Sequence, residues 1–156
     1  MPVTSVRRKI IRAYALTGGE WRLLLEATLM LTLIRLGLRL LPFQVVRSLL
    51  ARSGADARYP VSAASAGGRA VTGRVVWAIN SVSRLLGTTC LPRALATHTL
   101  LARRGLSSEL RIGVTRSPGS LLEAHAWVED ENTVLIGNLP NLAHYRPFAH
   151  LNGRGQ

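Results

Sequence analysis

The stretch CLPRALATHTLLARRGLSSELRIGV (Cys90–Val114) changes its hydrophobic period at Gly105. Before this glycine, leucines and alanines recur at helical spacing, and Pro92 is tolerated because it falls in the first helical turn. After it, the segment ELRIGVT alternates apolar residues with polar residues or glycine, which is typical of a strand. The stretch therefore predicts a helix that ends at Gly105 and leads into a β-strand.

Two more strands are predicted downstream. The segment EAHAWVE (123–129) alternates in the same way, and TVLIG (133–137) is a short apolar run. The turn segments SPGS and DEN precede these two strands, and such short connections favour an antiparallel meander. Asp130 and Glu131 fall in the second turn, where we expect both carboxylates to be solvated.

Helices are predicted upstream. The segment WRLLLEATLMLTLIRLGLRLLPF (21–43) is amphipathic with a wide apolar face, and a short helix follows over 43–52. The segment RAVTGRVVWAINSVSRLLG (69–87) places apolar residues from Val71 to Leu85 on one face and closes at Gly87.

The order of these elements indicates the fold class. Helices first and an antiparallel meander afterwards predict an α+β fold. The Ser-, Ala- and Gly-rich segment 53–68 reads as a loop or linker. We therefore expect a helical part over residues 1–66, suited to docking a partner, and a core over residues 67–156.

The net charge of +12 does not by itself predict nucleic-acid binding. Nearly all basic residues are arginines that occur singly along amphipathic segments, without interleaved aromatic residues. Residues 1–108 carry 16 basic and 3 acidic residues, whereas residues 109–156 carry 4 and 5. The two parts thus present different surfaces, and we expect no nucleic-acid partner.

The first long helix could be mistaken for a membrane span. Its longest uncharged run, Ala27–Ile34, is too short to cross a bilayer, so we interpret it as a packing helix, with a membrane-surface helix as the alternative. One cysteine excludes an intrachain disulfide, and the N-terminus lacks the apolar region of a signal peptide. We therefore expect a cytoplasmic protein.

Cys90 falls in the first turn of its predicted helix. Backbone N–H groups and the helix dipole stabilise an anion there, so they lower the pKa of a thiol and can bind an oxyanion. The alternative is that a lone cysteine is a small core residue.

His125 lies 35 residues after Cys90, in the middle of the strand EAHAWVE. Strand alternation places His125 and Trp127 on one face, and small alanines flank the histidine. A histidine that faces the N-terminus of a packed helix can accept the thiol proton. A structural histidine is the alternative, but a cysteine on a helix followed by a histidine on a strand is more specific than either part.

At this point the residues resemble a known family. The pattern CLPRALATHTLLARRGLSSELRIGV…AHAWVE is similar to the transglutaminase-like cysteine peptidases that remove leader peptides in lasso-peptide biosynthesis, in particular to the stand-alone peptidase half of a split B protein. The N-terminal LRLLPF and the tail HYRPFAHL fit more loosely. The resemblance implies a papain/transglutaminase-like fold with a Cys-bearing helix packed on a small antiparallel sheet.

The sequence departs from the family at one position. The aspartate that commonly orients the histidine falls, without gaps, on Gly137, and Asn138 is next to it. An asparagine can orient a catalytic histidine. The alternatives are a backbone carbonyl or a Cys90–His125 dyad. Trp127 is a candidate substrate contact, with a core or groove-wall role as the alternative.

The other histidines are weaker candidates. His98 lies eight residues after Cys90, about 12 Å along a helix, and is interpreted as packing. His144 and His150 lack metal-ligand spacing, so neither a metal nor a cofactor is expected.

We therefore predict a cysteine peptidase. The resemblance implies that it removes the leader peptide from a lasso-peptide precursor, with a separate small leader-recognition protein and an asparagine-synthetase-like cyclase as partners. The alternative is a non-catalytic basic adaptor that binds a membrane surface or nucleic acid.

Overall fold

The computed structural model describes residues 17–53, 61–63, 65–116 and 122–148. In chain order its elements are α2 (Gly18–Leu40), α3 (Phe43–Ser53), β1 (Val61–Ser62), α4 (Ala66–Leu86), α5 (Cys90–Ala102), β2 (Leu106–Ser107), β3 (Glu109–Arg116), β4 (Leu122–Asp130), β5 (Thr133–Ile136), a 3-10 turn η1 (Leu142–His144) and β6 (Arg146–Pro147). The α+β prediction is confirmed, and each predicted helix and strand is present.

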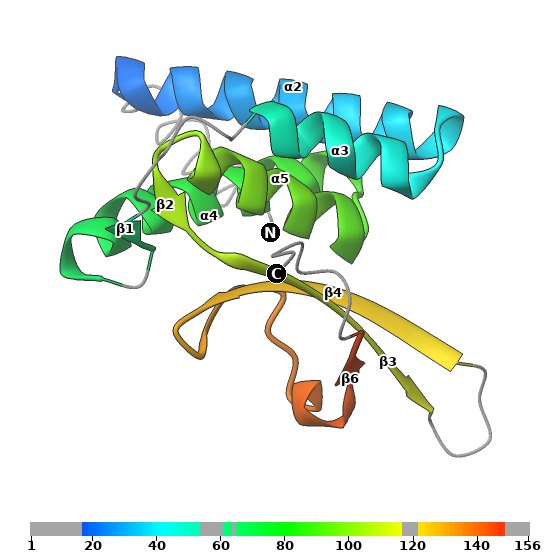
Figure 1. The fold of residues 1–156 in the computed structure, drawn as a ribbon. Coiled ribbons are helices and arrows are strands. Elements are labelled where there is room, and N and C mark those ends of the chain that lie inside the picture. The colour runs from blue at the N-terminus through cyan, green and yellow to red at the C-terminus, as the bar shows by residue number, and fades with distance from the viewer. Residues whose placement is uncertain (1–16, 54–60, 64, 117–121, 149–156) are drawn as a thin grey trace, which may run out of the picture.

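The helices are stacked on one side of the sheet (Figure 1). α2 and α3 lie side by side at the outside of the stack, and α5 lies between them and the sheet, in contact with α2, α4 and β4. α5 is largely buried because α2 and α3 cover one of its sides and the sheet covers the other. This arrangement fixes the start of α5 relative to the sheet.

The main sheet has four antiparallel strands in the order β5-β4-β3-β6. β3 and β4 form the predicted hairpin, with Gly113 directly opposite His125. β6 pairs with β3 through the register Gly113↔Pro147, and sequence reasoning did not anticipate this strand. A second pair joins β1 and β2 in parallel.

The helix ends follow from local sequence. Thr17 and Glu20 form a capping box at the start of α2, in which the Thr17 side chain accepts from the Glu20 backbone and the Glu20 carboxylate accepts from the Thr17 backbone. Gly87 ends α4 in the left-handed region with φ +58°, which glycine adopts at little cost. Leu85 was predicted on the buried face of α4, and this prediction is wrong because its side chain is exposed. On the helix, Leu85 falls just outside the arc that the buried residues of α4 occupy.

One hydrophobic core connects the helices to the sheet. Ala27, Leu31 and Ile34 of α2 are buried in the same cluster as Leu100 of α5 and Val128 of β4. Residues on both sides of the boundary expected after residue 66 therefore share this core. Within the described residues, no helix is long and apolar enough to span a membrane.

Asp130 corrects one prediction. Its side chain is buried at the end of β4, rather than solvated in the turn as expected. Ser62 Oγ donates to Asp130 Oδ2 at 2.6 Å, and Ser107 Oγ donates to Oδ1 at 3.2 Å. A buried carboxylate needs such donors, so Asp130 ties the β1–β2 pair to the main sheet. Glu131, the next residue, is exposed as predicted.

Candidate active site

Cys90 is the first residue of α5, and its side chain is partly buried. Thr89 occupies the N-cap position, but its side chain makes no capping hydrogen bond. The Thr89 side chain therefore leaves the N–H groups of Cys90 and Leu91 to a thiolate or an oxyanion, whereas Pro92 in the same turn has no N–H. Arg93, one turn further on, donates to Asn80 Oδ1 of α4 at 2.6 Å and anchors this end of α5.

His125 lies in the middle of β4, and its ring is held by a backbone group. Nε2 is 2.7 Å from the carbonyl oxygen of Gly137. Because a carbonyl can only accept, Nε2 must carry a proton, and the neutral ring then has its free lone pair on Nδ1. The histidine is thus held in the tautomer whose basic nitrogen points away from Gly137.

Gly137 can only be a glycine in this backbone. Its φ is +87°, and a Cβ atom built there would lie 2.8 Å from Trp127 Cβ and 2.9 Å from the Ala126 carbonyl oxygen. The chain after β5 therefore passes close to β4, which brings the Gly137 carbonyl to the imidazole. An aspartate at this position, as the family pattern would suggest, meets both a clash and an unfavourable backbone conformation.

Asn138, the sequence candidate for orienting the histidine, is exposed and follows directly after Gly137. Among the three alternatives that the sequence left open, the observed hydrogen bond corresponds to the backbone carbonyl.

Two aromatic rings enclose His125. The Trp127 ring is stacked at a centroid distance of 6.2 Å and an interplanar angle of 13°, and the Tyr145 ring is tilted by 55° at 5.6 Å. Gly113, opposite His125, leaves room for this arrangement, since a Cβ there would lie 3.0 Å from Trp127 Cη2. The imidazole is therefore restricted in both position and rotation.

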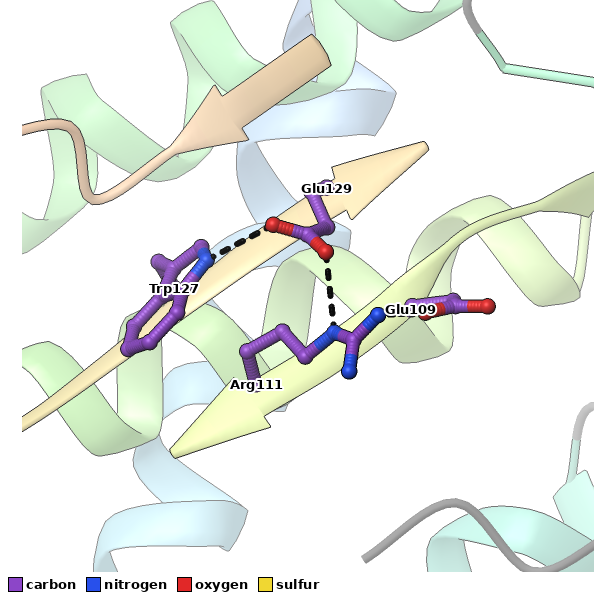
Figure 2. Close-up of polar contacts among 4 residues, drawn as sticks. All are labelled: Glu109, Arg111, Trp127 and Glu129. Atoms are coloured by element: carbon purple, nitrogen blue, oxygen red, sulfur yellow. Dashed lines mark hydrogen bonds and ion pairs between the residues drawn. The ribbon is translucent and has the colours of Figure 1, made fainter. Parts of the chain in front are cut away.

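Trp127 is itself fixed by a polar chain that runs across the hairpin (Figure 2). Its Nε1 donates to Glu129 Oε2 at 3.0 Å, and Glu129 Oε1 accepts from Arg111 Nε at 2.9 Å. Arg111 also pairs with Glu109 at 2.6 Å. Trp127 is only 4% exposed, so its observed surroundings are His125, Gly113 and Glu129 rather than open solvent.

Tyr145 packs on the histidine side of the site. It is buried, and its hydroxyl donates to Glu123 Oε2 at 3.4 Å. The pKa of Tyr145 is raised by burial, by the charge of Glu123 and, to a smaller extent, by the charge of an ionised Cys90. Tyr145 was missed by sequence reasoning, where only the loosely matching tail HYRPFAHL pointed toward it.

The helix that begins at Cys90 and the strand that carries His125 pack against each other, since α5 contacts β4. Tyr145 packs on the ring of His125. No hydrogen bond joins the thiol to the imidazole within the described part of the chain. In enzymes without substrate such hydrogen bonds are often long and tighten only in the complex.

His98 and His144 are not part of this site. His98 Nδ1 is 3.0 Å from Ser108 Oγ, and the pKa of His98 is lowered by burial and by the charge of Arg47. His144 is exposed on η1, and His150 falls outside the described residues. No group of three or more His, Cys, Asp or Glu suited to a metal ion occurs among the residues the structure describes.

Comparison with known proteins identifies the family. The model of the transglutaminase-like superfamily matches residues 28–150. No curated protein and no solved structure shows detectable similarity to the chain. Because the match covers most of the chain, the protein belongs to the transglutaminase-like superfamily, whose enzymes are generally of the cysteine-peptidase or transglutaminase type.

Proposed function

We propose that this member of the transglutaminase-like superfamily is a cysteine peptidase with Cys90 as nucleophile and His125 as general base and acid. His125 Nδ1 takes the thiol proton, and the thiolate attacks the carbonyl carbon of the scissile amide. The first-turn N–H groups of α5 stabilise the oxyanion. The imidazolium then protonates the leaving amine, and water hydrolyses the thioester to release the acid and regenerate the thiol.

The single observation that carries this proposal is the 2.7 Å contact between His125 Nε2 and the Gly137 carbonyl oxygen. It leaves Nδ1 as the basic nitrogen, on a residue of the strand against which α5 packs. In this proposal the carbonyl takes the part that an acid or an asparagine plays in related sites. Trp127 and Tyr145 are positioning residues, because they contact the imidazole rather than solvent.

The finer proposal concerns the substrate. The Cys-Leu-Pro helix and the His-Ala-Trp-Val-Glu strand resemble the leader peptidases of lasso-peptide biosynthesis. We therefore propose that the substrate is a ribosomally made precursor and that cleavage frees the N-terminus of its core. A small recognition protein would hold the leader, with residues 1–66 as its docking region, and an asparagine-synthetase-like cyclase would act on the product.

The test is a cleavage reaction followed by mass spectrometry. A lasso-peptide precursor and a leader-recognition protein of the proposed kind are incubated with wild-type enzyme or with Cys90→Ala. We expect wild type to release leader and core, faster with the recognition protein than without it, and the variant to release neither. A non-catalytic adaptor predicts instead that Cys90→Ala has no effect, and normal cleavage by a folded variant would contradict the peptidase proposal.

A further inference from the structure

An apolar groove is lined mainly by side chains of α2 and α3. These two helices lie on the side of the molecule away from the sheet (Figure 1). The volume of the groove is about 370 Å³, and its lining includes Leu29, Leu33, Gly37, Leu41, Val46 and Leu49. The two helices meet closely at its floor, since a Cβ at Gly37 would lie 3.3 Å from Val46 Cγ2. The groove is thus a concave surface with aliphatic walls.

A ridge of exposed leucines continues this groove along α2. Leu25, Leu29, Leu33, Leu36 and Leu40 recur every three or four residues, which places them on one face of the helix. Their exposure ranges from 51% at Leu36 to 72% at Leu40. Single exposed leucines are common, but a contiguous row beside an apolar groove is typical of an interaction site.

The charge around this surface is positive. A second cavity of about 440 Å³ adjoins the groove at Glu26 and Arg103, and Arg22 and Arg74 line it. Arg22, Arg74 and Arg103 are exposed. The acidic residues there already have partners, since Glu26 pairs with Arg104 at 2.6 Å and Glu20 caps α2. The surface therefore combines aliphatic side chains with arginines able to bind carboxylates.

We propose that the α2–α3 groove and the adjoining arginines form a docking site for an acidic amphipathic helix of a partner protein. Leucine-type side chains of the helix enter the groove in the manner of helix-in-groove recognition, and its acidic residues face Arg22, Arg74 and Arg103. The groove lies within the docking region of residues 1–66 proposed above, and this inference specifies the surface and the chemistry of the partner there, independently of the Cys90 reaction.

Charge decides among the possible occupants. A second copy would bring the same arginines to the same face, so like charges would meet. The chain's own residues 1–16 carry four basic residues and no acidic one, so they do not complement the surface either. An anionic membrane would match the charge, but a concave groove between two helices suits side chains of a helix better than a flat lipid surface.

The test uses a defined probe. A fluorescein-labelled 18-residue peptide with leucines at helical spacing and glutamates elsewhere is titrated with the full chain by fluorescence anisotropy, beside the same peptide with lysines. We expect saturable binding of the glutamate peptide only. Leu33→Glu and Arg103→Glu should each weaken it by at least about tenfold. Leu85→Glu and Arg84→Glu, at exposed positions of α4 outside both cavities, should leave it unchanged.

Several results would overturn the proposal. These are equal binding of both peptides, absence of saturable binding, or equal effects of the groove and control variants. Sedimentation with phosphatidylserine vesicles that depends on Leu33 while the peptide does not bind would assign the face to a membrane. A dimer that Leu33→Glu converts to monomer would assign it to self-association. Cys90→Ala must bind the peptide normally, which separates this proposal from the peptidase reaction.

Discussion

The sheet around His125 and the outer face of α2 and α3 are built in opposite ways. Around His125, side chains are satisfied within the chain: the imidazole by Gly137, the indole by Glu129, and Glu129 by Arg111. On the outer face of α2, leucines from Leu25 to Leu40 stand exposed beside an apolar groove. The residues around His125 are thus held in place by other residues of the chain, whereas the outer face of α2 and α3 offers apolar surface that another molecule can bury.

This difference has an energetic side. Fully burying a leucine side chain is worth about 1.5–3 kcal/mol. The leucines of the outer face are still 51–72% exposed, so part of this free energy is not used in folding and is available for binding. The histidine region has little such reserve, because its rings and polar atoms already have neighbours. We therefore expect substitutions around His125 to change the reaction rate, and substitutions on the outer face to change association.

The largest effect should come from the two reacting groups. Cys90→Ala removes the nucleophile and His125→Ala removes the base, and each should lower cleavage by about 10⁴-fold or more, since such residues act as a unit. Rates are measured by mass spectrometry with precursor and recognition protein, and the fold is checked by circular dichroism. His144→Ala, at an exposed position on η1, is the matched control and should retain activity. Activity in folded His125→Ala would remove the histidine from the mechanism.

The next two variants test whether the Gly137 carbonyl or the Asn138 side chain orients His125. Gly137→Ala forces a Cβ into contact with Trp127 and the Ala126 carbonyl at positive φ, so it should cost about 1–3 kcal/mol of stability and displace the carbonyl from His125. Urea unfolding and cleavage rates measure the two losses.

Asn138→Ala is the companion variant. Because Asn138 is exposed and Gly137 already contacts Nε2, we expect cleavage within about threefold of wild type. A loss of roughly tenfold or more at unchanged stability would transfer the orienting role to the Asn138 side chain.

The contrast between the two regions also shows what sequence reasoning can reach. The change of period at Gly105 and the alternation in EAHAWVE were sufficient to predict α5, β3 and β4, because local patterning determines such elements. Cys90 at a helix N-terminus and His125 mid-strand followed from the same patterns.

The features that were not predicted depend on contacts between segments that are far apart in the sequence. The Gly137 carbonyl carries no side-chain signature, and β6 is a two-residue strand that exists only because β3 offers an edge. Asp130 looked like a turn residue, and its burial depends on Ser62, which lies 68 residues away. Tyr145 could be connected with His125 only after β6 was placed beside β3.

Tyr145 tests whether the rings around His125 affect the rate. Tyr145→Ala removes the ring that packs on the imidazole and should lower kcat by about tenfold with little change in KM. Tyr145→Phe keeps the ring and loses only the 3.4 Å hydrogen bond to Glu123, so it should stay close to wild type.

Comparison of rate with stability distinguishes positioning from a merely structural role. If Tyr145 restricts the imidazole, Tyr145→Ala should lower kcat far more than it changes thermal unfolding, and Tyr145→Phe should change neither by much. Equal rates for the two variants would show that the ring does not matter for the reaction.

The smallest effect concerns His98, which lies on α5 but away from the reacting groups. Its pKa is lowered below the ordinary value of 6.5, first by burial and then by the charge of Arg47. As the pH falls below 6.5, the unfolded chain therefore binds a proton at His98 that the folded protein resists, and stability is lost until the folded pKa is reached.

His98→Asn removes the titrating group while it can keep a polar contact to Ser108. Urea unfolding at several pH values between about 8 and 5.5 should show wild type losing stability more steeply than the variant, with cleavage at pH 8 unchanged. If the stability of wild type and of His98→Asn changed in parallel with pH, His98 would have the same pKa in the folded and unfolded states, contrary to the prediction. A large loss of cleavage at pH 8 in the variant would instead give His98 a role in the reaction.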